Sequence, residues 1–229
     1  MTVPHGTPDA PRISVRGEAH LEVDPEIARI GVTVASRGKD RRTALDDLTR
    51  RNTAALDLLK SYGDAVEHLE TGSFSVTPEL KEHGRGERVH AYHGRVHLTA
   101  ELTDFTALGE LTTRLADLDL TRVDGPFWAL RRDSPAYREA RQQAVREAVQ
   151  RAREYAEALG TTLVALIELT DTGDFAAEGS RPQFAAGPRM RSRAAYAEDT
   201  AAAPLDLEPQ RQHVHAQVDA RFTMAPPRL

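Results

Sequence analysis

The chain lacks cysteine altogether and is poor in aromatic residues, which make up 5% of its 229 residues. Without cysteine it can form no disulfide and offers no thiolate as nucleophile or metal ligand. No apolar run approaches the roughly eighteen residues that a transmembrane helix needs, so no membrane span is expected. Neither sign of charge dominates, because 30 basic and 35 acidic residues are interspersed and leave a net charge of −5. This balance argues against a nucleic-acid partner.

The first twelve residues, MTVPHGTPDAPR, contain neither a basic segment nor an apolar core of about seven residues. They do not resemble a secretory signal, and the sequence therefore predicts a cytoplasmic location. The alternative is an exported protein from whose chain the signal has been removed. Hydrophobic residues form 40% of the chain, which is enough for one sizeable domain or two small ones.

Residues 13–36, ISVRGEAHLEVDPEIARIGVTVAS, alternate between apolar and polar side chains. This period of two is typical of strands with one buried face, and it places Glu18 and His20 on the solvent side of the first strand. Asp24-Pro25-Glu26 has the composition of a turn. We therefore expect the two strands to form a β-hairpin.

The rest of the chain alternates between helical and strand patterns. Apolar residues at spacings of three and four predict helices at about 40–62, 104–118 and 134–159, and Asp104 and Ser134 are expected as N-caps. Further strands are predicted at 66–80, 89–104, 123–131, 161–171 and 214–224. Residues 161–171 are so continuously apolar that we expect them in the centre of a sheet. The order β-β-α-β-β-α-β-α-β-β predicts an α+β fold with a mixed, largely antiparallel sheet and helices packed on one face.

Composition divides the chain further. Residues 1–11 are predicted to be a flexible lead and 225–229 a C-terminal tail. Residues 12–224 are expected to form a single domain, or two interleaved subdomains. Within it, about 173–208 are rich in alanine and proline and are predicted to be a mobile insertion.

Histidine is the residue type that most nearly suggests a metal site. His93 and His97 share the polar face of one predicted strand, and His213 and His215 share that of the last. Were those strands paired, four imidazoles could converge as zinc or nickel ligands. The spacing matches no established metal motif, and an exposed strand position suits histidine well. The four residues are therefore metal-ligand candidates only, and no metal is assigned.

Three common motifs of catalysis or phosphate binding are absent from the sequence. It contains no G-x-S-x-G elbow, no H-E-x-x-H pair and no glycine-rich phosphate loop. Paired acidic residues such as Glu18 and Glu22 lie on predicted solvent faces. The sequence therefore assigns no catalytic residue and no cofactor, and it favours a protein that is not an enzyme.

Several phrases in order resemble the SIMPL-domain family of bacteria. The family's opening phrase, I-S-V-x-G-E followed by P-D/E-x-A-x-I, corresponds here to Ile13, Ser14, Val15, Gly17, Glu18, Pro25, Glu26, Ala28 and Ile30. Its long-helix phrase of alanines four residues apart corresponds to Ala140, Ala144, Ala148, Ala152, Ala156 and Gly160. The resemblance covers about residues 12–224. It implies the fold predicted above. Members are mostly exported and include immunogenic proteins that assemble into large rings, so the resemblance also implies an oligomerising protein; it supplies no catalytic residues.

Three functions remain compatible with the sequence. The first is a non-enzymatic SIMPL-domain protein that forms homo-oligomers or binds a protein partner. The second is a metal-binding protein, or a metal-dependent enzyme, that uses His93, His97, His213 and His215. The third is a small-molecule binder with a cleft between sheet and helices. The oligomeric state in solution separates the first from the others.

Overall fold

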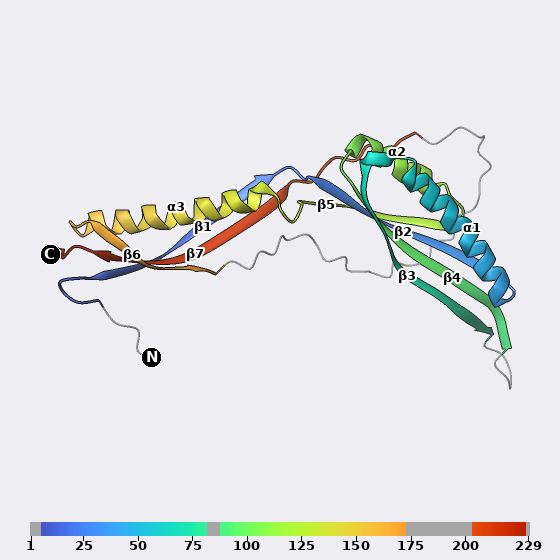
Figure 1. Cartoon of the computed structure of the whole chain (residues 1–229), viewed down its shortest axis with the longest axis horizontal. Coiled ribbons are helices and arrows are strands. Elements are labelled where there is room, and N and C mark those ends of the chain that lie inside the picture. Colours follow the sequence, from blue (N-terminus) through green and yellow to red (C-terminus); the bar gives the residue numbers. More distant parts are fainter. Residues whose placement is uncertain (1–5, 82–87, 173–202, 228–229) are drawn as a thin grey trace. The chain divides into compact units, whose positions relative to one another are not determined.

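A computed structural model describes residues 6–81, 88–172 and 203–227 of the chain (Figure 1). The predicted α+β class and the predicted order of elements are both confirmed. In chain order the strands and helices are β1 Arg12–Val23, β2 Ile27–Gly38, α1 Arg41–Lys60, β3 Val66–Lys81, β4 Arg88–Leu102, α2 Phe105–Ala116, β5 Thr121–Ala129, α3 Pro135–Ala158, β6 Leu163–Asp171 and β7 Gln212–Met224, with a short 3-10 turn at Gly63–Ala65 before β3.

The chain divides into two compact units. One unit takes its residues from 1–24, 130–180 and 211–229, and the other from 25–129 and 181–210. The first contains a three-stranded antiparallel sheet of order β1-β7-β6 and helix α3. The second contains a four-stranded antiparallel sheet of order β3-β4-β2-β5 and helices α1 and α2. Most of the predicted insertion, residues 173–202, lies outside the described residues.

The first unit is organised by the alternation that the sequence displays. On β7, Val214, Ala216, Val218, Ala220 and Phe222 are buried and the intervening polar residues are not. Helix α3 packs on this buried face through alanines at every fourth position: Ala136, Ala140, Ala144, Ala148, Ala152 and Ala156. Small side chains on one stripe allow the helix to lie close to the sheet (Figure 1).

The second unit has its own core of larger side chains. Helices α1 and α2 cover one face of the four-stranded sheet, as Figure 1 shows, and bury Leu48, Leu59, Leu108, Leu111 and Leu115 against it. Asp104 caps α2 as predicted, since its carboxylate accepts hydrogen bonds from the N–H groups of Thr106 and Ala107. Gly72 lies at a shift of register in β3, between Thr71 and Ser73.

The expected hairpin of residues 13–36 is wrong. Strand β1 pairs with β7, so that Arg12 lies opposite Thr223 and Val23 opposite Gln212, whereas β2 pairs with β4 and β5. At the predicted turn, the Glu26 N–H donates to the Ala129 carbonyl at 3.0 Å and so begins the β2–β5 pairing. Alternation shows that each strand has one buried face, but it does not identify the partner. The chain passes from the first unit to the second at this point, between Asp24 and Pro25.

The expected central position of residues 161–171 is also wrong. Among the described residues, strand β6 pairs only with β7 and forms an edge of the three-stranded sheet. Eight of its nine residues are exposed. An apolar run can indicate a strand buried on both faces, but here α3 packs mainly on β1 and β7 and leaves β6 uncovered by described residues.

Candidate functional site

His93 and His97 on β4 alternate with the buried Val96 and Leu98, so they lie on the face of the four-stranded sheet that the helices leave open. His93 Nε2 lies 2.8 Å from Glu79 Oε2 on β3, and His97 Nδ1 lies 3.3 Å from Thr33 Oγ1 on β2. Arg37 also donates to Glu79 Oε2, at 2.9 Å. These hydrogen bonds, first that to His93 and then that to Arg37, lower the pKa of the Glu79 carboxyl below its ordinary value. Each imidazole thus has a different neighbour.

The histidines of β7 belong to the other sheet. His213 and His215 are exposed and alternate with buried Val214 and Ala216, so they face away from α3 as the polar pattern predicts. Strands β4 and β7 do not pair. The strand pairing on which a four-histidine site depends is therefore not found.

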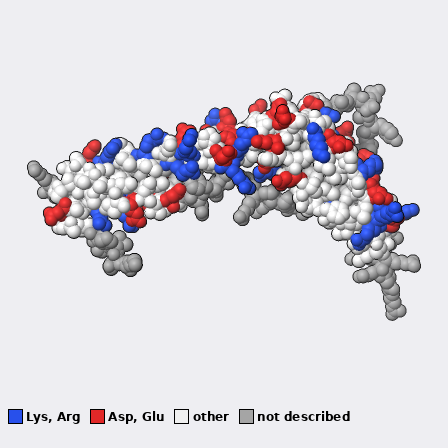
Figure 2. All heavy atoms as spheres, in the orientation of Figure 1, with Lys and Arg blue, Asp and Glu red and all other residues white. Residues whose placement is uncertain are grey.

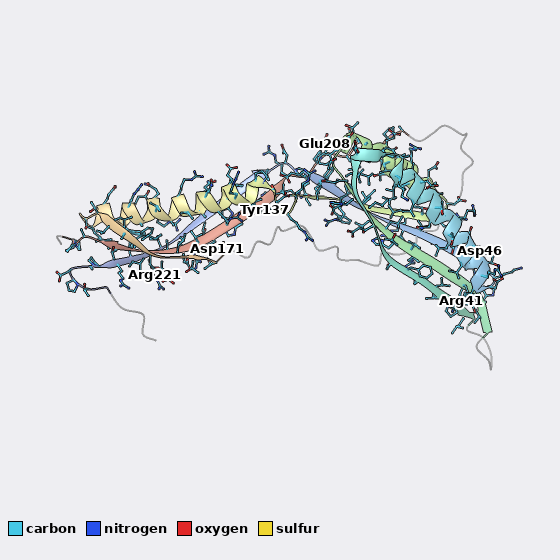
Figure 3. The ribbon with its side chains drawn as sticks, in the orientation of Figure 1. Arg41, Asp46, Tyr137, Asp171, Glu208 and Arg221 are labelled. Atoms are coloured by element: carbon cyan, nitrogen blue, oxygen red, sulfur yellow. The ribbon has the colours of Figure 1, made fainter. Side chains whose placement is uncertain are left out.

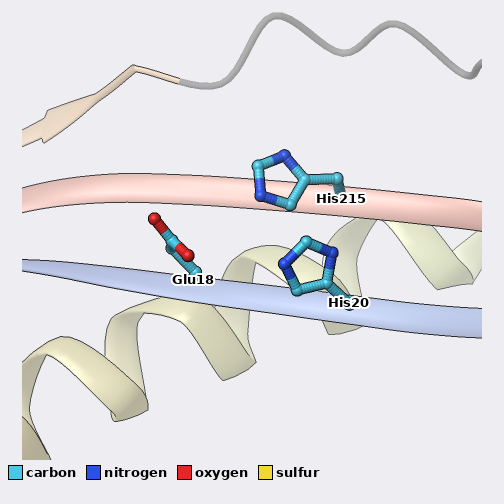
Figure 4. Close-up of side chains that lie close together, drawn as sticks. All are labelled: Glu18, His20 and His215. Atoms are coloured by element: carbon cyan, nitrogen blue, oxygen red, sulfur yellow. The ribbon is translucent and has the colours of Figure 1, made fainter.

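The β1–β7 register instead places His20 opposite His215 and Glu22 opposite His213. The His20 and His215 ring centroids are 4.4 Å apart, and Glu18 lies beside them on β1 (Figure 4). The sequence had placed Glu18 and His20 on a solvent face without linking them to His215. The sequence does not identify β7 as the partner of β1. The similar alternation of apolar and polar residues in the two strands is compatible with this pairing but does not specify it.

The hydroxyl groups of Ser36 and Thr33 are not arranged as a nucleophile with an oriented base. Ser36 and Lys39 have an S-x-x-K spacing, but the Ser36 hydroxyl is buried and donates to the Ala44 carbonyl at 2.7 Å. Thr33 contacts His97, yet within the described residues no carboxylate orients the other nitrogen of that imidazole. Acyl-transfer chemistry needs both contacts.

A hollow of about 660 Å³ lies at the N-terminal end of α3. Arg132, Ser134, Tyr137, Arg138 and Arg141 contribute to its wall. It differs from the expected cleft between sheet and helices, because its lining residues come from α3 and the loop that precedes it. Lys, Arg, Asp and Glu are intermixed over the face of the molecule shown in Figure 2, and no strip of one sign stands out there.

Strand β6 carries the most exposed apolar surface of the first unit. Large apolar side chains point to solvent along it: Val164 is 65% exposed, Leu166 53%, Ile167 42% and Leu169 46%. As an edge strand it also presents backbone N–H and C=O groups on its open side. Isolated exposed apolar residues are ordinary, but four in six positions of one edge strand form a patch suited to a second strand.

Comparison with known proteins relates the chain to a family of unknown function. The family model described as "SIMPL: Protein of unknown function (DUF541)" matches residues 13–222. The "26 kDa periplasmic immunogenic protein" of Brucella melitensis is 25% identical over 205 residues, which cover 86% of this chain and 77% of that protein. Its counterpart of the same name in Brucella abortus matches to the same extent. The "Uncharacterized protein YggE" of Edwardsiella ictaluri is 22% identical over 220 residues, or 95% of this chain and 89% of that protein.

These comparisons correct the predicted location. The expectation of a cytoplasmic protein is wrong, because the two Brucella relatives are named as periplasmic proteins, which points to export. Among the helices of the described residues, none combines the length and apolar character that crossing a membrane requires.

Proposed function

Because this chain belongs to the SIMPL family of proteins of unknown function, we propose that it acts without catalysis, by association of its own copies along strand β6. The observation that carries the proposal is the exposure of four large apolar side chains on an edge strand. The names of the Brucella relatives support a place of action outside the cytoplasm, in the periplasm.

The sequence of strand β6 contains neither lysine nor proline, two residues that usually protect an edge. Proteins keep such strands apart with lysine, proline or inward-pointing charges, whereas LVALIELTD contains only Glu168 and Asp171 as charged residues. Glu168 is held within the sheet, because Arg221 Nη1 on β7 donates to its Oε2 at 2.7 Å; Figure 3 labels Arg221 and Asp171. Ile167 and Leu169, on either side of Glu168, are exposed with respect to the described residues.

A second copy of the chain fits this edge. Two β6 strands that run antiparallel would form backbone hydrogen bonds with each other and would bury the same apolar side chains from both copies. Such an interface is self-complementary, since each side chain meets the equivalent patch. Each Å² of apolar surface that the association removes from water would contribute about 25 cal/mol to the burial free energy.

Light scattering coupled to size exclusion at micromolar concentration tests the proposal. We expect the 229-residue chain to elute at a multiple of its mass of 25.2 kDa. Ile167→Lys should shift it toward the monomer and weaken the association at least tenfold, because a charged side chain would enter the paired strands. Circular dichroism should show the variant folded.

Phe74→Lys is the matched control. Phe74 is 60% exposed and lies on β3, which is an edge strand of the other sheet. This variant should keep the oligomer intact. A wild-type protein that is monomeric across the concentration range would overturn self-association, and an unchanged oligomer in Ile167→Lys would overturn the role of β6.

A further inference from the structure

The outer face of the β1–β7 pair brings together three side chains with metal-binding atoms. His20 and His215 lie directly opposite each other in the antiparallel register, with their ring planes at 31°. Glu18 precedes His20 by two residues and so shares its face. One ligand atom from each of the three residues lies within 4.8 Å of the others (Figure 4).

The types of donor suit a particular class of ion. Imidazole nitrogen with a single carboxylate oxygen is a ligand set typical of Zn²⁺, Ni²⁺ and Cu²⁺, whereas Ca²⁺ and Mg²⁺ require oxygen donors. Ligands about 2.0–2.1 Å from a tetrahedral ion are about 3.3 Å from one another. All three side chains are exposed and can close the remaining gap by a change of rotamer.

The cations closest to Glu18 form their ion pairs with other carboxylates, although the charge of Arg16 also interacts with Glu18. Arg16, the closest cationic residue along β1, donates its Nε to Asp219 Oδ1 at 3.0 Å. Arg211 is 3.2 Å from Asp24 and 3.9 Å from Glu22. Throughout residues 6–81, 88–172 and 203–227, neither imidazole of the pair forms a hydrogen bond and Glu18 forms no ion pair.

We propose that Glu18, His20 and His215 bind one divalent transition-metal ion, with water in its remaining coordination positions. Of the common ions, Cu²⁺ binds most tightly, as the general order of divalent affinities requires. The site lies on the outer face of the β1–β7 pair and uses no residue of β6, so it is independent of the proposed association. It also differs from the four-histidine set suggested by sequence, of which it retains only His215.

Equilibrium dialysis of the 229-residue chain without a histidine tag, followed by elemental analysis, tests the site. With Cu²⁺, and separately with Ni²⁺ and Zn²⁺, we expect one ion per chain and the highest affinity for Cu²⁺. His20→Gln and His215→Gln should each weaken Cu²⁺ binding at least tenfold, and Glu18→Gln less. The imidazole signature in the Cu²⁺ electron paramagnetic resonance spectrum should be lost with either histidine.

Two matched variants separate this site from general binding by histidine. His93→Gln removes an exposed imidazole from β4, and His213→Gln removes one two residues from His215 on the same face. Both should bind Cu²⁺ as the wild type does. Binding that survives His20→Gln, or that falls equally in His93→Gln, would overturn the proposal. Failure of the β6 association would leave these results unchanged.

Discussion

At the scale of single residues, Gly17 determines how closely α3 approaches β1. The β1–β7 pairing runs through Gly17 without a shift of register, so the residue does not form a bulge. A Cβ atom at this position would lie 2.1 Å from the Ala144 carbonyl oxygen and 2.5 Å from the Ala148 nitrogen. The absence of a side chain is therefore what allows the helix backbone to touch the strand.

Gly17→Ala should accordingly destabilise the protein. Its methyl group would meet helix backbone, which cannot rotate away, and overpacking of this kind costs about 1–3 kcal/mol. Urea unfolding measures the loss. Gly72→Ala is the control, because the atom nearest to its Cβ would be His97 Cδ2 at an ordinary 3.6 Å. An equal loss in both variants would contradict the role of close approach at Gly17.

At the scale of elements, the helices are the part that local sequence predicts best. Asp40, Asp104 and Ser134 each accept a hydrogen bond from the first turn of the helix that follows. Such caps bind residues two or three positions later, so they can be predicted from the sequence before any tertiary contact is known. The edge position of β6 cannot be predicted in this way, because it depends on where α3 and β7 lie.

Helix α1 carries an ion pair whose contribution should depend on pH. Arg51 Nε donates to Asp47 Oδ2 at 2.8 Å, four residues apart, and this bond is the main cause of the lowered pKa of the Asp47 carboxyl. A carboxyl whose pKa is lower in the folded state stabilises that state above its unfolded pKa. The contribution is lost as the pH falls through the folded pKa.

Asp47→Asn should therefore lower stability at pH 7 by about 0.5 kcal/mol and have little effect in strong acid. Urea unfolding at both pH values measures the difference. Asp46→Asn is the matched control, since Asp46 is exposed and forms no ion pair with another described residue; Figure 3 labels it near Arg41. A loss at pH 7 that persists undiminished in acid would show that the ion pair is not its source.

At the scale of the whole molecule, the two units have separate hydrophobic cores. One core surrounds the leucines of α1 and α2, and the other surrounds the alanine stripe of α3. Trp128, the single tryptophan of the chain, packs against the core of the second unit, which contains α1 and α2. It packs edge-to-face on Phe105 with ring centroids 4.8 Å apart, so its fluorescence reports on that unit.

We expect the units to unfold in separate steps. Leu111→Ala creates a cavity beside α2 and should cost about 2–5 kcal/mol. It should move the Trp128 fluorescence transition to lower urea while part of the circular dichroism transition stays in place. Phe222→Ala, in the other core, should have the converse effect. Coincident transitions by both probes in every variant would show that the chain unfolds as one unit.

The sequence by itself determined the elements, their order, the N-caps of α2 and α3 and the buried face of each amphipathic strand. These features rest on period and on hydrogen bonds between near neighbours. Only the tertiary structure decided that β1 pairs with β7 instead of β2, that β6 is an edge, and that His20 meets His215. Alternation indicates that one face of a strand is buried but does not identify the neighbouring strand. The cluster of Glu18, His20 and His215 exists because β1, near the start of the chain, pairs with β7, near its end. The exposed edge of β6 likewise depends on which strands pair with one another.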